Sequence, residues 1–272
     1  MNTQSNNSKG IAVVTGASSG IGAVYADRLA ERGYDLLLVA RREDRLQALA
    51  QRLGGQYGIQ VEYLAADLSA PSDLGKVLKA IQENPRIALL VNNAGSAAFS
   101  PFADASPESS VAVIDLNITA LALLTHAVVP GFKARNAGTI INIGSVLGFH
   151  SLAYSSVYSG TKGFVVNFTR GLQEEFAGTG VRIQLVLPAA TATEIWDLAG
   201  ISPSQLDPAT VMTAENLVDA ALAGLDQGEL ITIPPLENAD LWTEFDAARQ
   251  QLFANTRSGR PASRYELLVE AQ

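Results

Sequence analysis

The stretch Ile11-Ala-Val-Val-Thr15-Gly16-Ala-Ser-Ser-Gly20-Ile-Gly22 joins an apolar run to a glycine-rich turn, and it decides the fold. The run predicts a buried strand, and the residues after the turn, through Arg32, have the pattern of an amphipathic helix. Glycines let the backbone turn sharply and approach a pyrophosphate, whose charge is received by the N–H groups and the dipole at the helix N-terminus. The stretch therefore predicts a dinucleotide-binding turn, and the alternative is a plain strand-to-helix connection.

Six more apolar runs follow at intervals long enough to hold helices. They are Asp35–Val39, Gln60–Leu64, Ile87–Val91, Thr139–Ile143, Val181–Leu187 and Leu230–Ile233. Most of them lack polar alternation, as do strands that helices cover on both faces. We therefore expect an α/β fold with a doubly wound parallel sheet of seven strands, the Rossmann fold, in a single domain.

The length of 272 residues suits one large domain, and with 47% hydrophobic residues the chain can bury a substantial core. We expect a flexible leader over residues 1–9, a catalytic domain over residues 10–255 and a C-terminal tail over residues 256–272. A substrate loop is expected at about residues 189–213. Its apolar residues predict a mobile lid that favours apolar substrates, and the alternative is a helix packed permanently on the core. They are Ile195, Trp196, Leu198, Ile201 and Met212.

Composition excludes several classes of function. A net charge of −8 and the lack of a basic run argue against nucleic-acid binding. No cysteine and only two histidines argue against disulfides, thiolate nucleophiles and a metal site. The first residues lack the apolar core of a signal peptide, and the apolar window Val111–Val129 contains Asp115, Asn117 and His126. We therefore expect a cytoplasmic protein without a membrane or nucleic-acid partner.

Two arginines follow the second expected strand, as Ala40-Arg41-Arg42. Folds that bind NAD usually carry an acidic residue there, which accepts hydrogen bonds from the ribose 2′-hydroxyl. Guanidinium groups in its place favour a 2′-phosphate, which Arg engages through paired hydrogen bonds. The site predicts NADP, and the alternative is that both arginines cap a solvated loop. Asp67 and Leu68, at the end of the third strand, are expected near the adenine.

Tyr158 and Lys162 lie four residues apart, about one helical turn, so both side chains project from one face. A nearby ammonium stabilises phenolate over phenol and lowers the tyrosine pKa from its usual value of about 10. The pair predicts acid–base chemistry on a carbonyl or an alcohol, and the alternative is a solvated helix face.

Asn92-Asn93-Ala94-Gly95, Asn117 and Ser145 lie between the glycine-rich turn and the Tyr–Lys pair. In order and spacing the whole set resembles the short-chain dehydrogenase/reductase family over about residues 10–235. The resemblance implies that Tyr158 is the catalytic acid, that Ser145 holds the substrate oxygen and that Lys162 also binds the nicotinamide ribose. It implies that Asn117 organises a proton-relay water, whereas from the residues alone Asn117 is equally well explained as a helix-interior asparagine that bonds to backbone.

Together with the resemblance, these patterns predict a complete cofactor site. Its expected residues are Gly16, Ser18, Ser19, Gly20, Ile21, Gly22, Arg41, Arg42, Asp67, Leu68, Asn93, Ala94, Gly95, Tyr158, Lys162, Pro188 and Thr193. Thr193 falls where the family's threonine contacts the carboxamide. One departure is Pro188-Ala189 where the family usually has Pro-Gly, because a Cβ restricts the backbone beside the nicotinamide.

The predicted function is an NADP(H)-dependent carbonyl reductase or alcohol dehydrogenase. The alternatives are a 3-oxoacyl-thioester reductase, disfavoured by a C-terminal segment unlike that of the family's acyl-carrier-protein reductases, and a non-catalytic cofactor-binding regulator. Apolar residues on more than one face of Val111–Val129 and of residues 155–176 predict a homotetramer or homodimer. Alternatively, the chain's own C-terminal segment covers the extra stripe.

Overall fold

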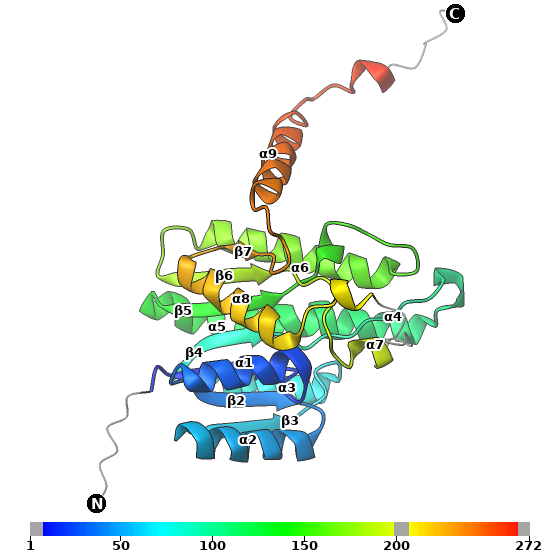
Figure 1. The fold of residues 1–272 in the computed structure, drawn as a ribbon. Coiled ribbons are helices and arrows are strands. Elements are labelled where there is room, and N and C mark those ends of the chain that lie inside the picture. Colours follow the sequence, from blue (N-terminus) through cyan, green and yellow to red (C-terminus); the bar gives the residue numbers. More distant parts are fainter. Residues whose placement is uncertain (1–7, 199–206, 266–272) are drawn as a thin grey trace, which may run out of the picture. The chain divides into compact units, whose positions relative to one another are not determined.

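In the computed structural model, which describes residues 8–198 and 207–265, seven parallel strands form one sheet in the order β3-β2-β1-β4-β5-β6-β7 (Figure 1). The strands are β1 (Ile11–Thr15), β2 (Asp35–Ala40), β3 (Val61–Ala65), β4 (Ile87–Asn92), β5 (Gly138–Ile143), β6 (Val181–Val186) and β7 (Ile231–Thr232). The predicted α/β fold with a doubly wound seven-stranded parallel sheet is confirmed. The last strand is shorter than the expected Leu230–Ile233.

The position of β1 between β2 and β4 determines where a ligand can bind. From β1 the chain first builds the sheet outward through β2 and β3, and then returns to build β4 to β7 on the other side. Ligands of such sheets bind in the crevice at the carboxyl ends of the strands where this direction changes. The residues just after β1 and β4 therefore border the expected site.

Helices cover both faces of the sheet (Figure 1). They are α1 (Gly20–Glu31), α2 (Glu43–Tyr57), α3 (Pro71–Gln82), α4 (Pro107–Ile114), the π-helical η2 (Asp115–Ala120), α5 (Leu121–Arg135), α6 (Ser156–Glu175), α7 (Ile195–Leu198) and α8 (Ala214–Gln227). One apolar cluster joins the sheet to α1, α2 and α8, and a second joins it to α3 and α5. Neighbouring residues of β1 enter opposite clusters, Ala12 the first and Val13 the second, which explains the unbroken apolar runs.

The helix ends follow local sequence rules. Ser106 caps α4 by accepting a hydrogen bond from the backbone N–H of Ser109 at 3.1 Å. Pro71 occupies the first turn of α3, where no intrahelical N–H bond is lost. Gly58 ends α2 with a φ of 68°, a left-handed conformation that costs glycine little.

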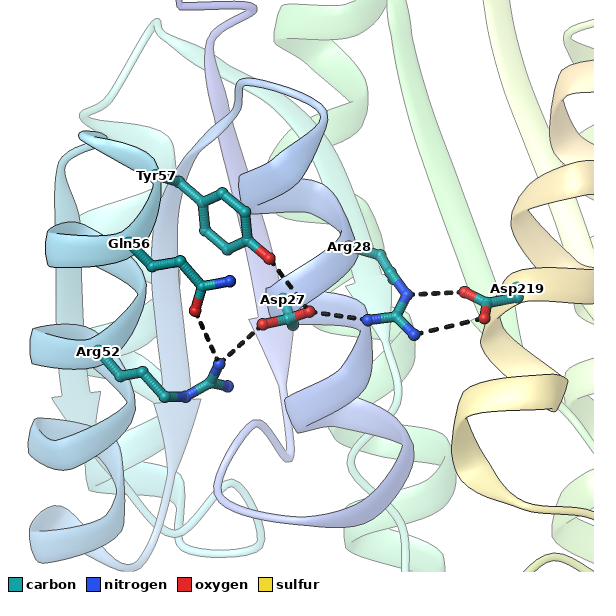
Figure 2. Close-up of polar contacts among 6 residues, drawn as sticks. All are labelled: Asp27, Arg28, Arg52, Gln56, Tyr57 and Asp219. Carbon is teal, nitrogen blue, oxygen red and sulfur yellow. Dashed lines mark hydrogen bonds and ion pairs between the residues drawn. The ribbon is translucent and has the colours of Figure 1, made fainter.

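A network of charged side chains joins α1, α2 and α8 on one face (Figure 2). Asp27 of α1 accepts hydrogen bonds from Arg28 at 2.8 Å, from Arg52 of α2 at 2.9 Å and from Tyr57 at 3.4 Å. Arg28 in turn donates to Asp219 of α8 at 2.7 Å. Exposed pairs of this kind contribute roughly 0.2–1 kcal/mol each, so the network supports the packing of the helices without dominating it.

Helices α4, η2 and α5 run on as one helix, Pro107–Arg135. By length and composition it could cross a membrane, the one such helix in the described part of the chain. Core helices of soluble proteins meet the same criterion, and α5 packs against β4, β5 and α3. Asn117 and Thr125 are buried within it.

The chain divides into one unit that ends at Pro235 and a second that begins at Leu236. The second unit contains α9 (Asp240–Ala254), none of whose residues is buried. Trp242 and Phe245 pack against each other there, with ring centroids 5.2 Å apart. The catalytic domain over residues 10–255 stays a prediction. Residues 1–7 of the expected leader and residues 266–272 of the expected tail lie outside the described residues.

Candidate active site

The glycine-rich turn after β1 packs directly on the loop after β4. Gly16 and Gly20 have φ values of 66° and 52°, which favour glycine. A Cβ on Gly22 would lie 2.3 Å from the Gly16 carbonyl oxygen and 2.6 Å from Asn93 Nδ2, so no side chain fits there. Asn93 Nδ2 donates to the Thr15 carbonyl at 2.8 Å. Asn93 therefore fastens the two loops together.

The N-terminus of α1 faces this turn. Ser19 is the N-cap residue, yet its side chain makes no capping hydrogen bond to the helix. The backbone N–H groups of the first turn, from Gly20 to Gly22, therefore keep their donors for another acceptor. Together with the helix dipole they can hold the phosphates of a dinucleotide. The backbone N–H of Ala94, in the loop after β4, donates a hydrogen bond to Thr15 Oγ1 at 3.0 Å. This bond holds the loop against the end of β1.

Arg42 connects the end of β2 to the turn. Its guanidinium donates to Ser18 Oγ at 3.1 Å, to Ser19 Oγ at 2.7 Å and, on its other side, to Glu194 Oε2 at 2.7 Å. The two serines thus face the arginine instead of the helix. Arg41 is exposed, so of the two predicted arginines the structure brings only Arg42 into contact with the turn.

Arg45 and Glu194 belong to the same cluster and were not predicted. Arg45 Nη1 donates to Glu194 Oε1 at 2.7 Å, so the carboxylate bridges both arginines. These hydrogen bonds, first from Arg45 and then from Arg42, lower the pKa of Glu194 to about 2. The spacing Arg42-x-x-Arg45 at the start of a helix could have indicated Arg45. Nothing local to Glu194 indicates its partners, which are 152 and 149 residues away.

Asp67 and Leu68, the two residues expected at the adenine, have different surroundings. Asp67 accepts hydrogen bonds from the backbone N–H and the hydroxyl of Ser69 at 2.9 Å and 2.6 Å, which forms a local turn. Leu68 is buried in the apolar cluster of α3. Its side chain therefore packs in the core, and its contact with an adenine stays a prediction.

Ser145, Tyr158 and Lys162 come together at the carboxyl end of β5. All three are buried, with exposed fractions of 8%, 9% and 7%. Tyr158 and Lys162 both lie in the first half of α6, the Ser145 side chain is near enough to Tyr158 to act on its pKa, and Lys162 Nζ lies 5.7 Å from the centroid of the Tyr158 ring. Lys162 Nζ also donates to the Ile143 carbonyl at 3.0 Å. The juxtaposition that the spacing predicts is present, and the roles of the three residues stay predictions.

The electrostatics of the trio differ from the expectation. Burial raises the pKa of Tyr158, and the nearby Ser145 side chain opposes this only in part. Burial also lowers the pKa of Lys162 to about 8, so the side chain stays charged at neutral pH but loses its proton more readily than an exposed lysine. The predicted lowering of the Tyr158 pKa is therefore not produced by the protein surroundings, because desolvation penalises the charged form of both groups.

Asn117 lies in the π-helical segment η2, a conformation found often at functional sites. Its amide exchanges two hydrogen bonds with the backbone of Ser96, each of 2.9 Å, and donates a third to Thr161 Oγ1 at 3.0 Å. The side chain therefore braces the loop after Gly95 against α6. It does bond to backbone, as the alternative interpretation held, but to a distant loop, and the proton-relay role stays a prediction.

Pro188 and Ala189 follow β6 beside Ser145. The Pro188 carbonyl accepts a hydrogen bond from the N–H of Val146 at 2.9 Å, which ties this loop to the residue after Ser145. In the described residues only Asn136 and Tyr154 combine a positive φ with a side chain, so Ala189 takes its conformation without glycine's freedom. Thr193 lies against the turn, since a Cβ on Gly20 would meet its Cγ2 at 3.0 Å.

Phe99 and Trp196 form an aromatic wall beside Tyr158. The ring centroid of Phe99 lies 5.5 Å from that of Tyr158 and 6.2 Å from that of Trp196, on which it stacks. Trp196 Nε1 is held by the Thr191 carbonyl at 2.7 Å. The sequence indicated Trp196 as part of an apolar loop but did not indicate Phe99. Residues 199–206 of that loop, Ile201 among them, and the side chain of Leu198 lie outside the described residues.

Comparisons with known proteins point to one family. The model described as short chain dehydrogenase matches residues 10–200. A very-long-chain 3-oxoacyl-CoA reductase of Anas platyrhynchos is 34% identical over 208 residues, which cover 75% of this chain and 66%, just under two thirds, of that relative.

Two solved structures are similar over nearly the whole chain. A short-chain dehydrogenase from Sphingobium yanoikuyae in complex with NADPH is 48% identical, with a TM-score of 0.91 over 94% of this chain and 99% of that one. The bulky-bulky ketone specific alcohol dehydrogenase from Comamonas testosteroni is 40% identical, with a TM-score of 0.86 over 94% and 98% of the two chains.

Proposed function

The chain belongs to the short-chain dehydrogenase family, and we propose that it is an NADP(H)-dependent oxidoreductase that reduces a ketone or aldehyde, or oxidises the alcohol. The observation that carries this proposal is the buried trio Ser145, Tyr158 and Lys162, which borders the loop after β4, the loop that packs on the glycine-rich turn. A hydroxyl donor, a phenol and an ammonium are the groups that proton transfer to a carbonyl requires.

The chemistry divides between cofactor and protein. When bound, NADPH supplies the hydride that adds to the carbonyl carbon. Tyr158 donates its phenolic proton to the carbonyl oxygen, and the Ser145 hydroxyl donates a hydrogen bond to that oxygen as it gains charge. The raised pKa of Tyr158 means that the phenol carries its proton at neutral pH.

Support for NADP(H) comes from the turn and from Arg42. The first turn of α1 receives no capping hydrogen bond from the Ser19 side chain, so its backbone N–H groups can donate to a pyrophosphate. Arg42 lies at the end of β2, where a 2′-phosphate would be recognised, and its guanidinium can bind such a group through paired hydrogen bonds. The similar dehydrogenase from Sphingobium yanoikuyae binds NADPH.

An apolar, bulky ketone is the substrate that the aromatic wall favours. Phe99 and Trp196 offer stacked rings next to Tyr158, and such surfaces bind flat or bulky apolar groups. The similar alcohol dehydrogenase from Comamonas testosteroni is described as specific for bulky-bulky ketones, which agrees with this class of substrate. The 34% identical 3-oxoacyl-CoA reductase supports a 3-oxoacyl thioester as the second candidate.

We further propose a cytoplasmic homotetramer or homodimer. Val111, Ile114 and Leu123 of the α4–α5 helix are exposed, by 54%, 39% and 42%. On α6, Phe164 and Phe168 stack at 5.4 Å and are only half-buried. A second copy that covered these residues would remove a large apolar surface from water.

The decisive experiment measures NADPH consumption by the purified protein with a panel of bulky aryl ketones, small polar ketones and 3-oxoacyl thioesters. Turnover of the bulky ketones with the highest kcat/KM is expected. Preference for the thioesters would establish the second candidate. NADPH binding without turnover of any carbonyl would instead support the regulator.

A further inference from the structure

The Glu194 carboxylate binds Arg42, which the proposed function assigns to the cofactor, and also Arg45. Its two oxygens accept hydrogen bonds from Arg42 and Arg45, both at 2.7 Å. All three side chains remain reachable from solvent, with exposed fractions of 39%, 44% and 42% for Arg42, Arg45 and Glu194. A soluble anion can therefore compete for the same donors.

The arrangement around Glu194 is suited to a larger anion. Arg42 also donates to Ser18 and Ser19, so its guanidinium is held against the turn and cannot follow Glu194 freely. A phosphate monoester carries a charge of about −1.5 to −2 and three acceptor oxygens, more than one carboxylate offers. It would gain stronger hydrogen bonds from the same two arginines.

Glu194 is attached to the substrate side of the site. Thr193, its neighbour, lies on Gly20, and Trp196, two residues later, stacks on Phe99 beside Tyr158. The backbone before it is anchored, since the N–H of Ala192 donates to the Met212 carbonyl at 2.8 Å. The carboxylate can therefore leave the arginines by rotation of its own side chain while the segment keeps its place.

We infer that Glu194 is a specificity-determining residue that occupies the 2′-phosphate subsite on Arg42 and Arg45 and must be displaced when NADP(H) binds. This inference rests on the proposed function. It assigns Glu194 an opposing role: the residue lowers the affinity for NADP(H) and leaves the affinity for cofactors without a 2′-phosphate almost unchanged.

The test compares Glu194→Gln with the wild type by titration of NADPH, adenosine 2′,5′-bisphosphate and 5′-AMP, with the dissociation constants as the readout. Glutamine keeps the size of the side chain but removes the charge. Exposed ion pairs contribute little each, so tighter binding of NADPH and of the bisphosphate by about 3- to 10-fold is expected. Binding of 5′-AMP should change by less than about 2-fold.

Asp226→Asn is the matched control. Asp226 forms a similarly exposed two-bond pair with Arg32, at 2.8 Å and 2.9 Å, away from the glycine-rich turn. Its substitution should leave all three dissociation constants unchanged. Glu194→Ala serves as the second variant, and it should tighten bisphosphate binding in the same way.

The inference is overturned if both Glu194 variants bind the bisphosphate as the wild type does, or more weakly, since the residue would then be irrelevant or would position the arginines. Those results would leave the proposed function intact. If neither the wild type nor the variants bind NADPH, the proposed function fails together with the inference.

Discussion

The two ends of the candidate site differ in their exposure to water. At the catalytic end, Ser145, Tyr158 and Lys162 are all less than 10% exposed, and burial dominates the pKa of both titratable groups. At the arginine end, the side chains of Arg42 and Glu194 are about 40% exposed and bind each other through charged hydrogen bonds. Desolvation therefore governs the first end, and partly exposed ion pairs govern the second. Substitutions should accordingly have large effects at the first end and graded effects at the second.

The largest effect is expected for Tyr158→Phe. The variant removes the proton donor and little else, so kcat should fall by roughly 10²- to 10⁴-fold while NADPH binding is retained. Lys162→Ala should reduce both, because its ammonium is expected to contact the ribose as well. Steady-state kinetics and NADPH titration of the two variants measure this difference. Turnover of Tyr158→Phe close to that of the wild type would remove the tyrosine from the mechanism.

Arg42→Ala should weaken NADPH binding by about 10- to 100-fold, since a hydrogen-bonding partner of a charged group is lost. Binding of NADH should change little. Arg41→Ala is the paired control, because Arg41 is exposed and adjoins Arg42 in sequence. From the sequence alone both arginines were expected to favour a 2′-phosphate, and the structure brings only Arg42 to the glycine-rich turn. A larger loss in Arg41→Ala would assign the phosphate contact to Arg41.

Gly22→Ala tests the close packing of the glycine-rich turn against the loop after β4. Its Cβ would lie 2.3 Å from the Gly16 carbonyl, so the turn must shift, at a cost of roughly 1–3 kcal/mol in the free energy of unfolding. Gly75→Ala in α3 is the control, because its Cβ would meet nothing within 4 Å. That variant should instead gain about 0.4–1 kcal/mol. Chemical denaturation measures both, and equal stability of the two variants would contradict the packing described.

The smallest effect concerns pH. Lys162 is charged below its pKa of about 8 and loses its proton as the pH rises through that value. If its ammonium binds the ribose, NADPH affinity should fall by roughly 3- to 10-fold between about pH 7 and about pH 9. Lys162→Met should bind more weakly and show a flat profile. A wild-type affinity that is constant over this range would mean that Lys162 does not contribute its charge to binding.

The sequence by itself determined the parts of this protein that depend on neighbouring residues. Apolar runs at regular intervals predicted seven parallel strands, and the turn between Thr15 and Gly22 predicted the dinucleotide-binding geometry. The four-residue spacing of Tyr158 and Lys162 predicted that they share a helix face. Helical and strand periodicity are local properties, so a single chain displays them directly.

Only the tertiary structure decided which distant residues come into contact and in which direction burial shifts the pKa of Tyr158 and Lys162. Glu194 reaches Arg45 across 149 residues, and Phe99 meets Trp196 from another loop, because the sheet brings the carboxyl ends of its strands to one edge. The structure also reversed the expected pKa shift of Tyr158, since a sequence shows the charge of Lys162 but not the burial of both groups. Burial arises from the packing of the whole fold, and no local pattern encodes it.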